Sequence, residues 1–121
     1  MLDIPGTRGL EIEALSEKGR ALLGRGDWNL AIECSEHAMR LLETQQGIAT
    51  EAQRFYFTHY KILLAKQRSG EAQLYLQKAY QALRQVAEEI DDAALKKSFL
   101  ENVSINHQIL QSWRELQQAN P

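Results

Sequence analysis

Apolar residues recur at steps of three and four along almost the whole chain, with polar and charged residues between them. That spacing places the apolar residues on one face of an α-helix, whereas the strict alternation of a half-buried strand never persists. The longest apolar stripe is Ala72, Leu76, Ala79, Leu83, Val86 and Ile90. The pattern therefore predicts an all-α fold with six helices near 8–24, 28–43, 50–68, 70–90, 92–102 and 105–118.

Turn and capping residues separate these helices. Gly26 can adopt a positive φ to end the first helix, and Asp27 can cap the second. The segment 44–50 is polar and forms the longest connection. The other connections are short, so neighbouring helices are expected to pack antiparallel. Similar turn and cap signals precede the fourth and fifth helices, at Ser69-Gly70 and Asp91-Asp92.

Small residues spaced by seven indicate close contact between helices. Ala31 and Ala38 lie on one face over two turns, and Ala72 and Ala79 repeat that spacing. A large aromatic at the turn can fill the space where two helices diverge. The residues predicted to be buried are Trp28, Ala31, Ala38, Leu63, Leu76, Ala79 and Phe99.

The stretch GRGDWNLAIECSEHAMRLL resembles the tetratricopeptide repeat, a helix–turn–helix unit. The resemblance covers about 12–45, and a weaker second copy covers about 50–84. It implies antiparallel helical hairpins stacked as an α-α superhelix. The sequence departs from the repeat at Lys18, Ser35 and Glu43. The positions that match are Gly19, Leu22, Gly26, Asp27, Trp28, Ala31, Ile32, Ala38 and Leu41.

The tail AEEIDDAALKKSFLENVSINHQILQSW resembles the closing segment of helical-repeat regions in large bacterial LuxR/MalT-like regulators and signal-transduction ATPases. In such tails an acidic pair precedes a helix, and a final helix ends the array. A repeat array exposes an apolar end, which a terminal helix must cover. Residues 91–118 are therefore interpreted as a C-terminal cap, and 1–121 as a single domain.

Composition narrows the class of protein. The apolar content of 44% and charged content of 25% are those of an ordinary globular domain. No apolar run is long enough to span a membrane, and the first residues carry no secretory signal. Cys34 is the single cysteine, which suits a reducing, cytoplasmic setting. The net charge of −2 predicts no wholesale attraction to nucleic acid or anionic lipid.

The sequence offers little catalytic chemistry. Cys34 and His37 lie three apart on one helix, and His59 could join them as a third metal ligand. Cys34, however, falls in the packing stripe between Ala31 and Ala38, which favours a buried structural thiol. No triad order, paired-cysteine motif or glycine-rich phosphate loop is present. We therefore expect no enzyme, no cofactor and no metal site.

The repeat resemblance implies a non-catalytic protein–protein interaction or regulatory scaffold module, with the first helix of each hairpin lining a concave groove. The partner expected there is a protein or peptide, acidic and partly hydrophobic, because the groove is basic with an apolar floor. Phe57 packing against the first hairpin or another subunit, within a homo-oligomer, is the alternative. The groove residues predicted are Glu13, Ser16, Arg20, Leu23, Arg54, Phe57, Lys61 and Leu64.

A second hypothesis rests on the uneven charge. Residues 51–84 hold two acids and six bases, a local charge of +4. This basic island could serve a nucleic-acid-contacting helical accessory domain, although it carries no groove-reading motif. A solvated helix face explains the same island equally well. The residues that would contact the nucleic acid are Arg54, Lys61, Lys66, Arg68 and Lys78.

Overall fold

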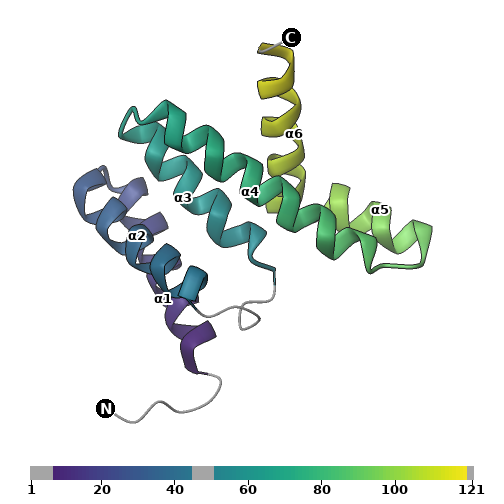
Figure 1. The fold of residues 1–121 in the computed structure, drawn as a ribbon, viewed down its shortest axis with the longest axis horizontal. Helices are drawn as coiled ribbons and strands as arrows, with labels where there is room; N and C mark the ends of the chain where they lie inside the picture. Colours follow the sequence, from purple (N-terminus) through teal and green to yellow (C-terminus); the bar gives the residue numbers. More distant parts are fainter. Residues whose placement is uncertain (1–6, 45–50, 120–121) are drawn as a thin grey trace.

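The computed structural model describes residues 7–44 and 51–119, and all of its regular structure is helical (Figure 1). No strand occurs among these residues, which confirms the all-α prediction. The predicted connection at 44–50 lies outside the described residues except for Thr44. The six helices are α1 (Thr7–Gly24), α2 (Trp28–Thr44), α3 (Gln53–Ala65), α4 (Ser69–Glu88), α5 (Ala93–Asn102) and α6 (Ser104–Ala119).

Most helix ends lie within three residues of their predicted positions. Gly26 has a φ of 81° in the turn after α1, a conformation that glycine adopts readily. The Asp92 carboxylate accepts a hydrogen bond of 2.9 Å from the Leu95 backbone N–H, so it caps α5 as predicted. The turn after α3 differs from the prediction. Gln67 takes the left-handed conformation with a φ of 60°, while Gly70 lies inside the first turn of α4.

The helices pack as pairs. α1 packs along α2 and α3 packs along α4, each pair being joined by a short turn. α3 also contacts α1, α2 and α6, so it lies at the centre of the molecule (Figure 1). α6 rises from α3 and α4, and α5 projects beyond the end of α4. α5 touches α4 only sparsely and packs mainly on α6.

Close approach of the first two pairs depends on small side chains. A Cβ placed on Gly19 would lie 3.3 Å from Ile62 Cδ1 and 3.4 Å from the Ala31 carbonyl oxygen. Both distances are short for a Cβ contact, so a side chain at Gly19 would require Ile62 or the α2 backbone to shift by a few tenths of an ångström. Ala31 and Ala38 are fully buried, as the spacing of small residues predicted.

The core predictions hold for five of the seven residues, and two are wrong. Leu63, Leu76 and Ala79 are buried together with Ala31 and Ala38. Trp28 is 48% exposed, because it is the first residue of α2 and stands at the outer turn. Phe99 is only half-buried, and no other residue of α5 is fully buried either.

α5 and α6, which we call the C-terminal pair, cover the end of the α3–α4 pair. Phe57, Leu76, Ala79, Leu83 and Ile109 form one buried cluster there. Phe99 and Trp113 pack against this cluster. The Trp113 ring also stacks on Tyr80 with ring centroids 4.6 Å apart.

Two buried amides tie the C-terminal pair to the start of α3. Gln53 Nε2 donates to Asn106 Oδ1 at 3.3 Å, and Asn106 Nδ2 donates to the Phe99 carbonyl oxygen at 3.0 Å. Both amides are fully buried. Because a buried polar group loses its hydrogen bonds to water, these contacts fix one arrangement of α3, α5 and α6.

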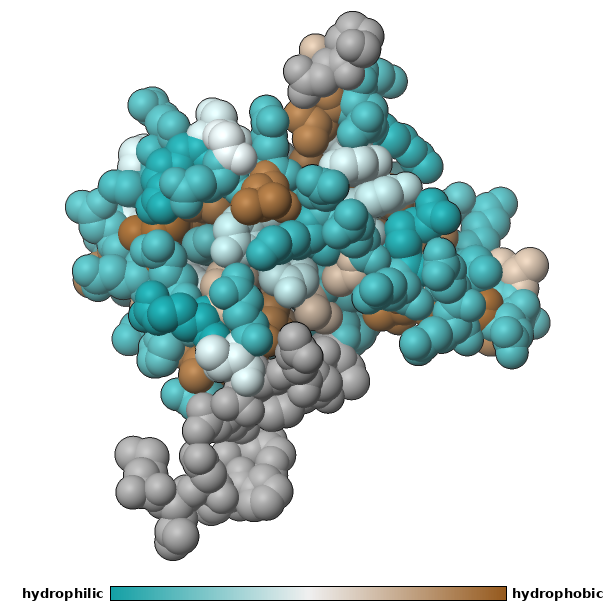
Figure 2. Space-filling view, in the orientation of Figure 1, coloured by the Kyte–Doolittle hydropathy of each residue, from teal (hydrophilic) through white to brown (hydrophobic). Residues whose placement is uncertain are grey.

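The surface seen in Figure 2 is mainly hydrophilic, with small separated groups of hydrophobic side chains. The large hydrophobic residues that remain exposed are distributed over several helices. No helix within the described parts of the chain combines the length and apolar character needed to cross a bilayer. The exposed residues are Leu10, Trp28, Leu30, Leu64, Leu74, Leu95 and Val103.

Candidate functional site

A hollow of about 250 Å³ lies between α1, α3 and α6. It contains three cations and one carboxylate, together with hydroxyl and amide groups and two apolar side chains. Its walls thus come from three parts of the sequence that lie far apart. The lining residues are Ser16, Glu17, Arg20, Arg54, Phe55, Thr58, Lys61, Ser104, Ile105 and Gln108.

Helical periodicity brings the lining residues of each helix onto one side. Ser16 and Arg20 are four residues apart on α1, while Arg54, Thr58 and Lys61 follow at steps of four and three on α3. Ser16 and Thr58 are each 5% exposed and form the base of the hollow. The longer basic side chains rise around them.

The cations differ in how well they are paired. The Arg20 guanidinium donates to Glu17 at 2.8 Å, and Arg54 Nη1 lies 3.8 Å from a Glu13 oxygen. Arg54 Nε is buried without a hydrogen-bond partner within the described structure. No carboxylate of the described residues lies within ion-pair distance of Lys61. Lys61 therefore keeps its donors for a ligand, whereas Arg20 and Arg54 already lie near one carboxylate each.

Lys61 is partly buried and lies close to another positive charge. Its Nζ stands 5.3 Å from the centroid of the Phe57 ring, a cation–π distance. Burial lowers the pKa of Lys61, and the neighbouring charge of Arg20 lowers it further. A ligand carboxylate placed between these two cations would relieve their repulsion, and so the hollow favours an anion.

Four of the eight predicted groove residues line this hollow, namely Ser16, Arg20, Arg54 and Lys61. Glu13 lies at its edge as the partner of Arg54. The other three are elsewhere. Phe57 is 2% exposed within the core, so it provides no apolar floor at the surface, and Leu23 packs on the cluster around Ile62 and Leu63. Leu64 is exposed but does not line the hollow.

Nothing in the sequence indicated that α6 completes the hollow. Ser104, Ile105 and Gln108 lie on one face of α6, yet they are some forty to ninety residues distant from the rest of the site. Periodicity reports only what shares a face within one helix. The apolar part of the hollow, supplied by Phe55 and Ile105, was missed for the same reason.

The suggested metal ligands do not come together. Cys34 is half-buried and Ser35 takes the buried position between Ala31 and Ala38, so the prediction of a buried thiol in that stripe is wrong. His37 is exposed, whereas His59 is 3% exposed. The described residues contain no cluster of His, Cys, Asp and Glu that could hold a metal ion.

His59 instead belongs to a buried polar contact between α2, α3 and α4. A hydrogen bond of 2.7 Å joins its Nδ1 to Ser35 Oγ, and its ring meets Tyr75 edge-on with centroids 4.4 Å apart. The small Ser35 leaves the room that this ring occupies. Burial lowers the pKa of His59 to about 4, and the charge of Arg68 contributes to the shift.

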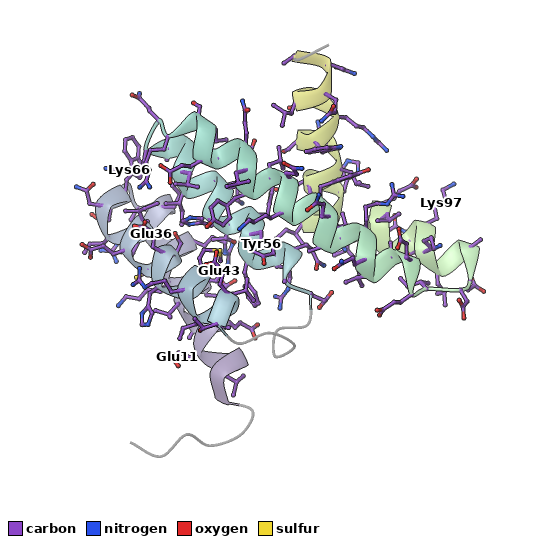
Figure 3. All side chains as sticks on the ribbon, in the orientation of Figure 1. Glu11, Glu36, Glu43, Tyr56, Lys66 and Lys97 are labelled. Atoms are coloured by element: carbon purple, nitrogen blue, oxygen red, sulfur yellow. The ribbon has the colours of Figure 1, made fainter. Side chains whose placement is uncertain are left out.

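Half of the basic island is paired with acids, since three of its six bases, Arg54, Arg68 and Lys78, lie within ion-pair distance of one. Arg68 lies 2.6 Å from Glu71 and 4.0 Å from Glu36, while Lys78 lies 3.7 Å from Glu43. Figure 3 shows Glu36 and Glu43 on α2 in the direction of α4, with Tyr56 close to Glu43. Burial, with Glu43 as a second cause, raises the pKa of Tyr56. These pairs leave no continuous basic surface, which favours the solvated helix face over a nucleic-acid interface.

Comparison with known proteins adds no relative, because no family model, curated protein or solved structure matches this chain.

Proposed function

We propose that this chain is a non-catalytic protein–protein interaction module that binds an acidic, partly apolar segment of a partner in the hollow between α1, α3 and α6. The observation that carries the proposal is the convergence of Arg20, Arg54 and Lys61 on one hollow that contains a single carboxylate, Glu17. Charge-assisted hydrogen bonds to a partner carboxylate are shorter and stronger than neutral ones.

The size of the hollow defines what enters it. A volume of about 250 Å³ accommodates one or two side chains rather than a whole helix. A glutamate or aspartate of the partner would accept hydrogen bonds from Lys61 Nζ and the Arg20 guanidinium. An adjacent apolar side chain would contact Ile105 and Phe55 at the wall. A short acidic motif with one hydrophobic residue fits these groups.

The resemblance to tetratricopeptide repeats supports the same function, since the first helix of each hairpin lines the concave side in that family. α1 and α3 are those helices here, and both line the hollow. The resemblance of residues 91–118 to the end of bacterial regulators suggests where the module acts. On that basis we place it in a larger signalling or transcription regulator, with 91–118 as the terminal cap.

The test compares two double variants that change the charge equally. Arg20→Glu/Lys61→Glu reverses the hollow, while Lys18→Glu/Arg25→Glu reverses two exposed cations of the α1 region outside it. An array of acidic peptides identifies a binder, and fluorescence anisotropy measures its affinity. We expect the first variant to bind the peptide more than about tenfold more weakly, because the loss of a single charged contact already has an effect of that size. The second variant should bind the peptide as the wild type does.

Equal binding of every peptide by all three proteins would remove the hollow from consideration. A parallel titration with generic duplex DNA tests the alternative function. Affinity for the duplex that falls steeply with salt, together with no affinity for any peptide, would favour the nucleic-acid hypothesis.

A further inference from the structure

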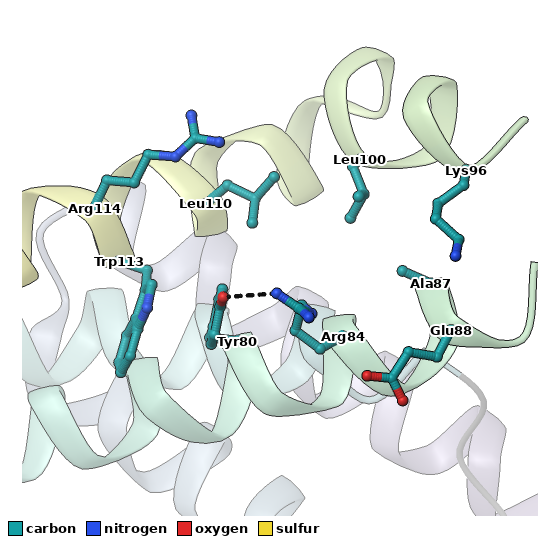
Figure 4. Close-up of a pocket in the computed structure, with 9 residues that line it drawn as sticks. All are labelled: Tyr80, Arg84, Ala87, Glu88, Lys96, Leu100, Leu110, Trp113 and Arg114. Atoms are coloured by element: carbon teal, nitrogen blue, oxygen red, sulfur yellow. Dashed lines mark hydrogen bonds between the residues drawn. The ribbon is translucent and has the colours of Figure 1, made fainter. Parts of the chain in front are cut away.

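A second hollow opens on the other side of α6, between α4, α5 and α6. It has a volume of about 280 Å³ and adjoins a larger, shallower hollow of about 650 Å³ between α5 and α6. We call the two together the C-terminal wedge. Leu100, Leu110 and Lys96 line both hollows. Figure 4 shows Leu100 on α5 and Leu110 on α6, with α4 on the opposite side of the hollow.

The wedge is separate from the hollow between α1, α3 and α6. Ser104, Ile105 and Gln108 lie on one face of α6, whereas Leu110, Trp113 and Arg114 lie on the opposite face. α6 is thus a wall shared by two sites. An occupant of the wedge would not reach Arg20 or Lys61.

The wedge exists because α5 diverges from α4. α4 and α5 make few contacts with each other, and no residue of α5 is fully buried. α6 leans on α4 through the stack of Trp113 on Tyr80, which closes one end of the wedge. Between these contacts, the half-buried side chains of Leu100, Leu110 and Trp113 face Ala87 across open space.

The rim of the wedge is basic. No carboxylate of the described residues lies within ion-pair distance of Arg84, Lys96 or Arg114. The only hydrogen bond of Arg84 with another side chain in the described structure goes from Nη1 to the Tyr80 hydroxyl at 3.1 Å (Figure 4). Glu88 is the one acid lining the inner hollow, which leaves that hollow with a net charge of +2.

The outer hollow adds one more cation and two acids, Lys97, Asp91 and Glu101. Its net charge is therefore +1, counting Lys96 and Arg114 with them. The positive character is strongest next to the apolar floor. An occupant consequently needs apolar side chains at its centre and carboxylates on both sides of them.

We propose that the C-terminal wedge docks an acidic amphipathic helix of a partner protein. Apolar side chains at steps of three and four would insert between Leu100, Leu110 and Trp113, as in other helix-in-groove complexes. Carboxylates flanking that stripe would pair with Arg84, Lys96 and Arg114. The complementary charge selects an acidic helix over a neutral or basic one.

The probe is a synthetic helical peptide with leucines at i, i+3, i+4 and i+7 and glutamates at most other positions. Trp113 reports its binding directly, because Trp28→Phe removes the second of the two tryptophans in the chain. Two control peptides have serine in place of each leucine, or lysine in place of each glutamate. Only the first peptide should change the Trp113 fluorescence.

Variants locate the binding. We expect two variants to lower the affinity for the peptide more than about tenfold each. Lys96→Glu/Arg114→Glu reverses the charge of the rim, and Leu110→Ala removes part of the apolar floor. Circular dichroism verifies that each variant remains helical. The reversal Arg20→Glu/Lys61→Glu, in the hollow on the far side of α6, should leave this affinity unchanged.

Three results would overturn the proposal. The first is an affinity that Lys96→Glu/Arg114→Glu leaves intact, and the second is equal binding of the lysine peptide. The third is a dimer of the chain that Leu110→Ala dissociates while the acidic peptide does not bind, because this would assign the wedge to a second copy. None of these results depends on whether the hollow between α1, α3 and α6 binds its own partner.

Discussion

The first four helices and the last two are built differently. Three buried clusters involve α1 to α4, and three of the six bases between positions 51 and 84, namely Arg54, Arg68 and Lys78, lie close to an acid. α5 has no fully buried residue, and α6 has only Asn106 and Ile109. The cations on α5 and α6 have no carboxylate within ion-pair distance among the described residues.

This difference indicates a division of labour. Burial of apolar surface specifies the first two pairs, so their charges can pair along the surface without controlling the fold. The C-terminal pair depends on a few contacts, chiefly Ile109 in the cluster, the Tyr80–Trp113 stack and the Asn106 hydrogen bonds. Regions with few buried contacts open at lower free energy than the core, and their unused groups remain for partners.

The largest effect should come from the core of the first two pairs. Leu63 is fully buried between α2 and α3, so Leu63→Ala should lower the free energy of unfolding by about 2–5 kcal/mol. Leu100→Ala, the same change at the half-buried wall of the wedge, should cost about 1 kcal/mol. Urea unfolding followed by circular dichroism measures both.

Similar losses for the two leucine variants would show that the C-terminal pair is as tightly packed as the core. Ala21→Gly, an exposed change within α1, calibrates the effect of helix propensity alone at about 1 kcal/mol.

Repeating local signals made the helices of both regions predictable. The stripe from Ala72 to Leu83 and the small residues Ala31 and Ala38 follow a period that burial of one helix face requires. Asp92 was predictable as a cap because its role involves only the next few residues. Gln67 was not, since a left-handed residue other than glycine leaves little trace in the sequence.

Errors arose where a residue's environment depends on distant helices. Trp28 was predicted to be buried from its place at the turn, yet it is 48% exposed. Cys34 was predicted to be buried from periodicity, yet Ser35 takes the buried position and bonds His59 of α3. Arg20, Arg54 and Lys61, which the prediction placed on one face of their helices, all line the hollow, and their role in binding stays a prediction. The α6 wall of the hollow was not predicted, because nothing local connects residue 20 with residue 108.

The second effect concerns the polar link between the two regions. Asn106→Ala would leave the Gln53 amide without its acceptor and the Phe99 carbonyl without its donor, both in buried positions. We expect a loss of about 1–3 kcal/mol. Asn102→Ala, at an exposed position that bonds only Ser98 within the described structure, should change stability by less than about 0.5 kcal/mol.

Amide hydrogen exchange shows which helices lose stability in Asn106→Ala. Amides of α5 and α6 should exchange faster in Asn106→Ala, while those of α3 and α4 retain most of their protection. Faster exchange throughout the chain would mean that the six helices open as one unit, and the division between the regions would not stand.

The smallest effect is a pH dependence confined to the first two pairs. His59 has a pKa of about 4 in the fold against an ordinary value of 6.5, so the unfolded chain binds a proton that the folded chain does not. Stability from the neutral ring is therefore complete above pH 6.5 and is lost as the pH falls toward about 4. His59→Gln should flatten this slope, which is at most about 1.4 kcal/mol per pH unit for one proton.

The two tryptophans make that prediction a direct comparison of the regions. Trp28 is the first residue of α2, the helix whose Ser35 bonds His59. Trp113 lies in α6, whose buried hydrogen bond to α3 joins two amides, Gln53 and Asn106, that do not titrate. With each tryptophan alone, obtained through Trp113→Phe or Trp28→Phe, urea midpoints at pH 7 and pH 5 should show the Trp28 signal losing more stability in acid. Equal acid shifts for both tryptophans would mean that the C-terminal pair never separates from the core, because one cooperative transition imposes a single stability on every probe.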